Sequence, residues 1–326
     1  MILKSANGEL ITTEYVLPPD NRAAVSSKRS SMETPVIDIT DLSKYYGKTR
    51  GIEHVNLEIG EGEIFGFIGP NGAGKSTTIR ILMNLIFQTG GTARIMGMDV
   101  IKETKKIKKI SGYIPSDAGL YSSMDALEFF RYCIRFYQVK NGDQRINELA
   151  QMFDVDLTRK VSDLSMGNRK KVSIIQSLLH NPKLLILDEP TTGLDPLMQS
   201  NFFELLRSEN RKGMTIFFSS HILGEVQKLC KRVAIIKEGR IIQVEDIETL
   251  RKKQLKKVFI EFNGRVKKED LIIPGIEGEI GGSDNIQSFI YSGDINMLVG
   301  FLSRYTIINL MIEEPSLEEI FMHYYK

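Results

Sequence analysis

Residues 69–77, GPNGAGKST, place glycines, a lysine and two hydroxyl side chains within one short loop. Glycines let consecutive backbone N–H groups surround an anion, because no Cβ atom stands in the way. A lysine beside them suits the β- and γ-phosphates of a nucleotide, and a serine hydroxyl suits Mg²⁺. The spacing G-x-x-x-x-G-K-[ST] therefore predicts a phosphate-binding loop, in which Lys75 serves catalysis and Ser76 binds the metal. Its expected ligands are Gly69, Asn71, Gly72, Ala73, Gly74, Lys75, Ser76 and Thr77.

Two acidic residues follow a short apolar run, LLIL, at residues 184–187. Asp188 ends the run and is expected to hold Mg²⁺ at the end of a buried strand. Glu189 comes next, where a carboxylate can act on the attacking water as general base or orient it. The alternative is that these acids only cap the following turn. The presence of a phosphate-binding loop in the same chain favours the metal-binding and catalytic roles.

His221 follows another apolar run, in TIFFSSH. If the two runs form adjacent strands, His221 approaches the γ-phosphate; otherwise it is an incidental histidine at a strand end.

A third feature is DLSMGNRKK, residues 163–171, at the start of an expected helix. Ser165 and Gly167 there offer a hydroxyl and free backbone N–H groups, which suit a second anion. Tyr46, in SKYYGKT, is by itself an exposed turn aromatic.

The elements that carry these residues alternate between strand and helix patterns. Apolar and polar residues alternate in VIDITDLS (36–43), and HVNLEIGEGEIFGFIGP (54–70) predicts two further strands around a Gly-Glu-Gly turn. Beyond Lys75 the apolar spacing becomes helical. Apolar runs at 183–190, 214–221 and 232–242 predict strands of a parallel sheet that is buried on both faces. This alternation predicts an α/β core.

Three segments are expected along the chain. Residues 1–34 are polar and predict a tail with no clear fold, with Met32 as an alternative start. Residues 35–250 carry the motifs. Residues 251–326, entered through the basic, helix-like TLRKKQLKK (249–257), predict a small C-terminal α/β appendage. Its expected elements are strands at KVFIEF, SFIY and TIINLMI, a helix at DINMLVGFLSR and a closing helix at PSLEEIFMHYY.

Composition narrows the class of protein. The 326 residues are 42% hydrophobic and 26% charged, as in ordinary globular domains. Lys and Arg number 43 against 41 Asp and Glu, which argues against nucleic acid as a partner. Two cysteines are too few for a disulfide framework and indicate a reducing cytoplasm. No apolar run approaches the roughly 20 residues of a membrane span, and the N-terminus lacks a signal-peptide core, so any membrane role is expected through a partner.

Taken in order, these motifs resemble those of the ATP-binding subunit of an ABC transporter, over about residues 36–245. The resemblance implies a P-loop NTPase core of ABC cassette type with a helical subdomain. It makes Tyr46 an adenine platform, LSMGN (164–168) the signature motif, GLDP (193–196) the D-loop and His221 the switch histidine. It also implies ATP and Mg²⁺ as cofactors and ATP hydrolysis as the activity, with Glu189 and His221 in catalytic roles.

The resemblance implies partners as well. In this family two cassettes dimerise head to tail, and each signature motif caps the ATP on the opposite P-loop. Ser165 and Gly167 would thus serve the nucleotide of a second ATP-binding subunit, with a homodimer as the expectation. The C-terminal appendage, ending in EEPSLEEIF, resembles that of exporter-type cassettes paired with a separate integral membrane permease. The expected location is therefore the cytoplasmic face of the cell membrane, peripheral through the permease.

Two positions depart from the family pattern. The signature motif usually ends in glutamine, where this chain has Asn168. In GYIPSDAGLY (112–121), Ser116 stands where the family has a glutamine that touches Mg²⁺ and senses the membrane subunit. Ser116 is expected to ligate the metal through a water, with a shorter reach, and Asp117 is an alternative.

Three rival functions have their own sequence requirements. An ABC protein of translation carries two cassettes in one chain, and this sequence has one. A DNA-repair ATPase of the coiled-coil type needs a long heptad region between P-loop and signature, where this chain has a short interval. A nucleotide-gated regulatory subunit with weak hydrolysis stays open because of Ser116.

Overall fold

The computed structural model describes residues 2–4, 10–12, 34–116, 123–248, 255–283 and 285–313. The chain divides into a unit of residues 1–34 and a unit of residues 35–326. In the first, β1 (Ile2–Lys4) and β2 (Leu10–Thr12) pair antiparallel. The sequence does not predict this short pairing.

Within the second unit, residues 35–248, called the large domain below, are built around a six-stranded sheet. Its strand order is β12-β11-β5-β10-β9-β8, and every neighbouring pair is parallel except β11 and β12. The strands are β5 (Ile64–Ile68), β8 (Ser111–Ile114), β9 (Leu184–Asp188), β10 (Thr215–Ser220), β11 (Arg232–Lys237) and β12 (Arg240–Asp246). Strands β5, β9 and β10 are buried at every position. The buried parallel strands expected at 183–190 and 214–221 are therefore confirmed. The run 232–242 is only partly so, because it forms the parallel strand β11 and then turns into β12, which is antiparallel and partly exposed.

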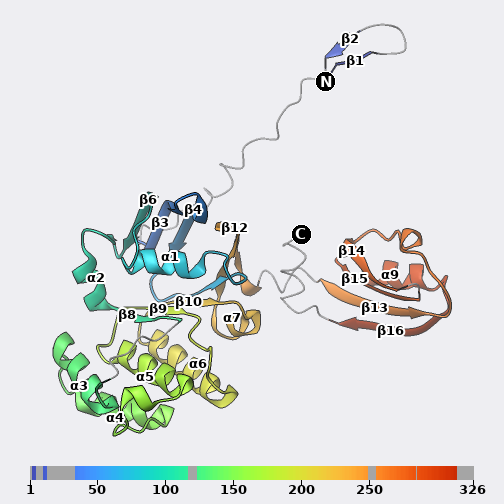
Figure 1. Ribbon diagram of the computed structural model, residues 1–326. Helices are drawn as coiled ribbons and strands as arrows, with labels where there is room; N and C mark the ends of the chain where they lie inside the picture. The colour runs from blue at the N-terminus through green and yellow to red at the C-terminus, as the bar shows by residue number, and fades with distance from the viewer. Residues whose placement is uncertain are drawn as a thin grey trace. The chain divides into compact units, whose positions relative to one another are not determined.

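A second, antiparallel sheet has the order β4-β3-β6-β7. Its strands are β3 (Ile37–Tyr46), β4 (Thr49–Ile59), β6 (Gly90–Ile95) and β7 (Met98–Asp99). Helix α1 (Lys75–Leu82) contacts β4 and β6 on one side and β9 on the other, so it lies between the two sheets (Figure 1). The strands expected from 36–43 and 54–70 and the helix after the phosphate-binding loop are thus confirmed.

The remaining helices of the large domain lie against the six-stranded sheet or against one another (Figure 1). They are α2 (Thr104–Ile110), α3 (Ala126–Tyr137), α4 (Gly142–Phe153), α5 (Met166–Leu178), α6 (Pro196–Arg211) and α7 (Leu223–Leu229), with a 3₁₀ turn at Val161–Asp163. Helices α5, α6 and α7 contact the strands, whereas α3 and α4 pack on α5 and form a helical subdomain with it. Helix α3 begins at a capping box between Asp125 and Glu128. Their side chains accept hydrogen bonds from backbone N–H groups that have no partner within the helix.

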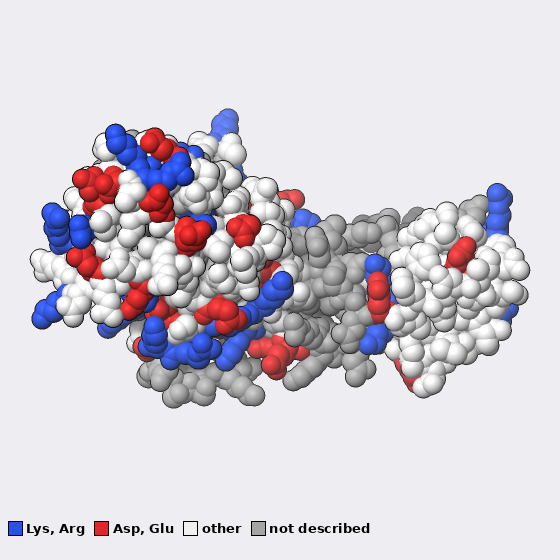
Figure 2. All heavy atoms as spheres, turned by 90° about the horizontal axis from the view of Figure 1, so that it is seen from below, with Lys and Arg blue, Asp and Glu red and all other residues white. Residues whose placement is uncertain are grey.

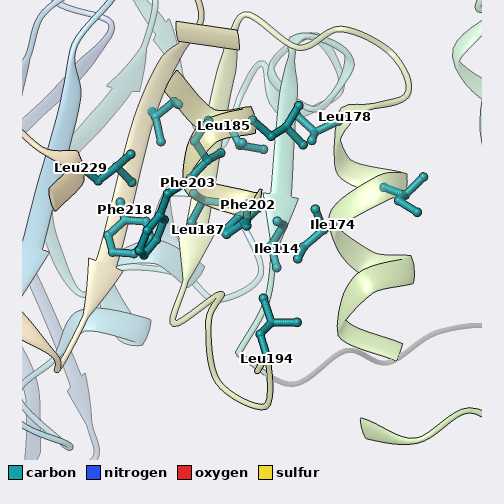
Figure 3. Packing of buried hydrophobic residues seen from close by; sticks show 14 of the residues in the cluster. Ile114, Ile174, Leu178, Leu185, Leu187, Leu194, Phe202, Phe203, Phe218 and Leu229 are labelled. Carbon is teal, nitrogen blue, oxygen red and sulfur yellow. The ribbon is translucent and has the colours of Figure 1, made fainter. Parts of the chain in front are cut away.

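The core has two layers because successive strand residues point to opposite faces of the sheet. Leu185 and Leu187 of β9 pack with residues of α5 and α6 in one cluster, whereas Leu184 and Ile186 pack with α1 and the antiparallel sheet in another. Figure 3 shows the first cluster, where Leu185 and Leu187 lie among side chains of α5, α6 and β10. Truncating such a leucine to alanine costs about 2–5 kcal/mol. Packing on both faces therefore stabilises the sheet that positions the site.

Residues 255–313, called the small domain below, have a four-stranded antiparallel sheet of order β14-β15-β13-β16. Its elements are β13 (Lys256–Phe262), a 3₁₀ turn (Lys268–Asp270), β14 (Ile276–Ser283), β15 (Ile286–Tyr291), α9 (Ile295–Leu302) and β16 (Ile307–Glu313). The three expected strands and the helix at 294–304 are confirmed, whereas glycine-rich β14 is not predicted. The expected closing helix at 315–325 and most of the basic stretch 249–257 lie outside the described residues.

The surface shows no strong bias of charge on the face drawn in Figure 2, where basic and acidic side chains are interspersed among uncharged residues. This mixture agrees with the near balance of charges in the sequence. None of the helices in the described ranges has the length and apolar character needed to cross a membrane.

Candidate functional site

The phosphate-binding loop joins β5 to α1, which is the strand–loop–helix context that the motif requires. Gly72 and Gly74 have φ angles of 79° and 111°, a region that favours glycine. At Gly69 a Cβ atom would lie 2.2 Å from the carbonyl oxygen of Ile236, so the packing against β11 admits only glycine. The loop therefore brings glycine backbone and the N-terminus of α1 to the carboxyl end of β5, as a phosphate cradle requires.

Lys75 places its ammonium group inside this loop. The side chain is 4% exposed, and its Nζ donates to the carbonyl oxygens of Gly69 at 2.7 Å and Pro70 at 3.1 Å. Nζ also lies 3.2 Å from Oε1 of Glu189, which follows β9. The structure thus joins the loop to the acidic residue that the sequence assigns to water activation.

Asp188 is buried at the carboxyl end of β9 and receives two hydroxyl donors. The Ser76 hydroxyl donates to its Oδ1 at 3.0 Å, and the Ser219 hydroxyl donates to the same oxygen at 3.1 Å. Burial raises the pKa of Asp188 because it penalises the charged form, although both hydroxyl donors act in the opposite direction. The parallel pairing of Asp188 with Ser219, on β10, creates this arrangement.

Glu189 connects Lys75 to His221. Its Oε2 lies 3.2 Å from Nδ1 of His221, while its Oε1 contacts the lysine. The side chains of Glu189 and His221 are 20% and 40% exposed, so both reach the surface at the edge of the sheet. Glu189 has a φ of 47°, a strained value for a side-chain-bearing residue, and its N–H donates to the Ser219 hydroxyl at 3.2 Å. Strained backbone of this kind is frequent at functional sites.

The donor set around Asp188 fits Mg²⁺. Oδ2 of Asp188 is buried and accepts no hydrogen bond from any described residue, although its charge favours a partner. The Ser76 hydroxyl contacts the other oxygen of the same carboxylate. Mg²⁺ in nucleotide sites is usually held by one or two protein ligands together with phosphates and waters. Among the described residues, no three or more His, Cys, Asp or Glu side chains are grouped so that they could hold a metal ion by themselves.

Tyr46 lies at the end of β3, beside the phosphate-binding loop. Its ring is 48% exposed, and Nζ of Lys44 lies 5.1 Å from the ring centroid. A Cβ atom built on Gly51 would be 2.9 Å from Cε2 of Tyr46 and 3.4 Å from Cγ2 of Thr77. Because Gly51 has no side chain, the tyrosine can approach the start of α1. An exposed aromatic ring at this position can stack on the base of a nucleotide.

The signature motif is placed at the N-terminus of α5. Ser165 is exposed and caps this helix, with its Oγ accepting from the N–H of Asn168 at 3.3 Å. Gly167 packs against the D-loop, since a Cβ atom there would lie 2.8 Å from the carbonyl oxygen of Gly193. The described contacts of Ser165 and Gly167 are with α5 and the D-loop, and none of them involves the phosphate-binding loop of the same chain.

Ser116 is half-buried and follows β8. Its carbonyl oxygen accepts a hydrogen bond from Nζ of Lys170 at 3.3 Å. In the described part of the chain its hydroxyl is not joined to Ser76 or Asp188, so a role as metal ligand stays a prediction. Asp117 lies outside the described residues.

Ser219 is a site residue that the sequence reasoning missed. It donates to Asp188 and accepts from the backbone of Glu189, and it is fully buried. The signal was its place in TIFFSSH, two residues before His221. Only the register of β10 against β9 shows that this serine faces both acidic residues.

Comparisons with known proteins bear on this geometry. Residues 52–192 match the ABC transporter family. The chain is 36% identical over 230 residues to the bacitracin transport ATP-binding protein BcrA of Bacillus licheniformis, covering 70% of this chain and 74% of that protein. This chain belongs to the ABC transporter ATP-binding proteins.

Solved structures agree with this assignment. The structure of an ATP-binding subunit of an ABC transporter covers 67% of this chain and 92% of its own, at 29% identity and a TM-score of 0.63. A dimeric ATP-binding cassette in a post-hydrolysis state, bound to ADP and Pi, covers 65% of this chain and 98% of its own, at 25% identity and a TM-score of 0.60. The large domain is therefore an ABC ATPase, which binds ATP and powers transport.

Proposed function

We propose that this ABC ATPase hydrolyses MgATP between two copies of the chain and thereby drives export through a separate integral membrane permease. The observation that carries the proposal is the convergence of Lys75, Glu189 and His221 beside the Ser76–Asp188 pair. These residues come from the carboxyl ends of β5, β9 and β10, where open α/β sheets bind ligands. The name of the relative BcrA, a bacitracin transport protein, supports a transported cargo of antimicrobial type.

The protein's part in the chemistry is chiefly to position groups and neutralise charge. Lys75, held now by loop carbonyls and Glu189, is within the loop that would receive the β- and γ-phosphates. Ser76 and Asp188 would hold Mg²⁺, which neutralises charge on the phosphate oxygens. Tyr46 offers its exposed ring to the adenine. Groups that the fold holds in fixed positions can stabilise the charge that develops in the transition state.

Glu189 is the residue proposed to act on water. Its carboxylate would accept a proton from the water that attacks the γ-phosphate, or orient that water for in-line attack. His221 holds the second carboxylate oxygen through Nδ1, so its Nε2 is the atom proposed to contact the γ-phosphate. Ser219 fixes the backbone from which this carboxylate projects.

A second copy of the chain completes the site. Ser165 and Gly167 lie at the N-terminus of a 13-residue helix, where an anion is stabilised by backbone N–H groups and the helix dipole. Their described contacts do not involve their own phosphate-binding loop, which supports a nucleotide supplied by another copy. The dimeric post-hydrolysis cassette structure also supports this arrangement.

The proposed permease contact is a groove beside Ser116. It has a volume of about 280 Å³ and is lined by Met83, Leu85, Tyr113, Pro115, Tyr137 and His180, among other residues. Leu85 is 52% exposed, and the ring of His180 stacks on Tyr137 at 4.0 Å. A partly apolar groove that is lined by two stacked aromatic rings suits a short helix of a membrane subunit. Attachment there would place the chain at the cytoplasmic face of the membrane.

Glu189→Gln tests the proposed chemistry. The amide keeps the size of the side chain but cannot accept the proton, so kcat should fall by about 10²–10⁴-fold. ATP binding should persist, because Lys75, Ser76 and Asp188 are unchanged, and an ATP-bound dimer should accumulate. Phosphate release and size-exclusion chromatography with ATP and Mg²⁺ measure the two effects.

The matched control is Glu204→Gln, which removes the same charge from an exposed position on α6. Hydrolysis by this control should equal that of the wild-type chain. Near-normal hydrolysis by Glu189→Gln would remove Glu189 from the mechanism. Undetectable hydrolysis by the wild-type chain, with ATP binding intact, would instead support a nucleotide-gated regulatory subunit.

A further inference from the structure

Lys170 is a buried lysine on the signature helix. It lies in the second turn of α5, is 3% exposed, and donates from Nζ to the carbonyl oxygens of Pro115 at 2.9 Å and Ser116 at 3.3 Å. A buried ammonium group is costly unless its hydrogen bonds are made. The positions of the two carbonyl groups and of the helix are therefore strongly linked.

A second contact joins α5 to β8, the strand that ends just before Pro115. A Cβ atom on Gly112 of β8 would lie 2.4 Å from the carbonyl oxygen of Ser177, so glycine lets the strand approach the backbone of α5. Ser177 is seven residues beyond Lys170, which is about 10 Å along a helix. Two attachment points this far apart, one to β8 and one to the residues that follow it, restrict rotation as well as translation of α5.

The N-terminus of this helix carries the half-site for nucleotide. Ser165 caps α5, and Gly167 follows in the first turn, so both move with Lys170. Ser116 lies where the chain leaves β8, beside the groove proposed for the permease. The lysine thus connects the exit of β8 to the signature motif through one side chain.

We propose that Lys170 is a positioning residue that transmits the position of residues 115–116 to the signature motif, and so to the nucleotide bound by the opposite copy. The inference rests on the proposed head-to-tail dimer. The two acceptors at residues 115 and 116 are main-chain oxygens, so these two contacts do not depend on the side chain at position 116. A serine there is therefore compatible with a coupled ATPase.

Lys170→Met tests the connection in the full chain, in the Glu189→Gln background. Methionine has a similar length and helix propensity but no donor. The ATP-dependent dimer should become at least tenfold weaker, measured by size-exclusion chromatography over a concentration series with ATP and Mg²⁺. The affinity of the monomer for a fluorescent ATP analogue should change less than twofold, because Lys170 does not contact the phosphate-binding loop in the described structure. A destabilised fold would lower both quantities, so this difference separates positioning from folding.

Lys171→Met is the matched control, since it removes the same charge from the next residue of the helix. Its dimer should stay within twofold of the background. Ser116→Gln added to Lys170→Met should not restore the dimer, because the lost contact is to the main chain. If Lys170→Met does not fold, Lys170→Gln is used instead. Its dimer should be at least threefold weaker than that of the Glu189→Gln background, while its affinity for the nucleotide should be unchanged.

The outcomes distinguish this inference from the proposed function. If Glu189→Gln alone binds ATP and forms no dimer, the head-to-tail proposal fails, and the inference fails with it. If that dimer forms and Lys170→Met leaves it unchanged, only the role of Lys170 is overturned. Equal losses of dimer and nucleotide affinity, or restoration by Ser116→Gln, also overturn the positioning role.

Discussion

Ser219→Ala removes one oxygen atom that links the two acidic residues of the site. The Ser219 hydroxyl donates to Oδ1 of Asp188 at 3.1 Å and accepts from the N–H of Glu189 at 3.2 Å. Asp188 keeps its bond from Ser76, whereas the N–H of Glu189 loses this acceptor. The change therefore acts mainly on the backbone of Glu189.

The size of the effect follows from burial and strain. A hydrogen bond to a charged group contributes about 1.5–3 kcal/mol, and an unsatisfied buried N–H costs about 1–3 kcal/mol. Glu189 also has a φ of 47°, a region that costs about 1–3 kcal/mol and needs support from its surroundings. We expect the free energy of unfolding to fall by about 2 kcal/mol. We also expect kcat to fall by about 10–100-fold, because the carboxylate loses its fixed position between Lys75 and His221.

Steady-state phosphate release at saturating MgATP measures kcat, and urea denaturation measures stability. Thr215→Val is the control, since the Thr215 hydroxyl accepts from the N–H of Gly62 at 2.9 Å at the other end of β10. This control should lose stability while kcat stays within twofold. If Ser219→Ala behaves in the same way, the serine has a structural role only and the reasoning is refuted.

Two further predictions concern groups outside the catalytic centre. The Tyr45 hydroxyl and Arg240 donate to Glu53 and lower the pKa of that carboxyl to about 2, from an ordinary value of 4.5. The contribution of this carboxylate to the free energy of unfolding should be complete above pH 4.5 and should decrease as the pH falls towards 2. Between pH 6 and pH 3, urea denaturation should show a smaller decrease in the free energy of unfolding for Tyr45→Phe than for wild type. Equal decreases would contradict a stabilising contact between Tyr45 and Glu53. Burial raises the pKa of the Cys133 thiol to about 11 and also raises that of Cys230, so neither should react with Ellman's reagent at pH 8 until guanidinium is added; rapid reaction of the native chain would contradict the buried thiols.

Most of the fold could be predicted because its signals are local. The strands that carry the site are short apolar runs, and α1 follows the phosphate-binding loop with a helical spacing. The strand β14 escaped prediction because its sequence, IEGEIGGS, is rich in glycine, and its pairing with β15 determines its conformation. The β1–β2 pair is likewise defined by contacts between residues that carry no strong strand pattern.

The candidate site divides in a similar way. Lys75, Ser76, Asp188, Glu189 and His221 were predicted because their types and spacing form motifs, and the structure brings all five together. That result depends on a rule that sequence reasoning can use: the carboxyl ends of neighbouring parallel strands lie on one edge of the sheet.

What the sequence determines is which chemical groups are available and in which local conformation, because a glycine loop before a helix depends on nearby residues alone. The tertiary structure decides which groups meet. Ser219 reaches both acidic residues only through the register of β10 against β9. Lys170 reaches two carbonyl groups more than fifty residues away only because α5 packs on β8. Register and helix packing are set by the fit of a whole buried core, and no single stretch of sequence contains that information.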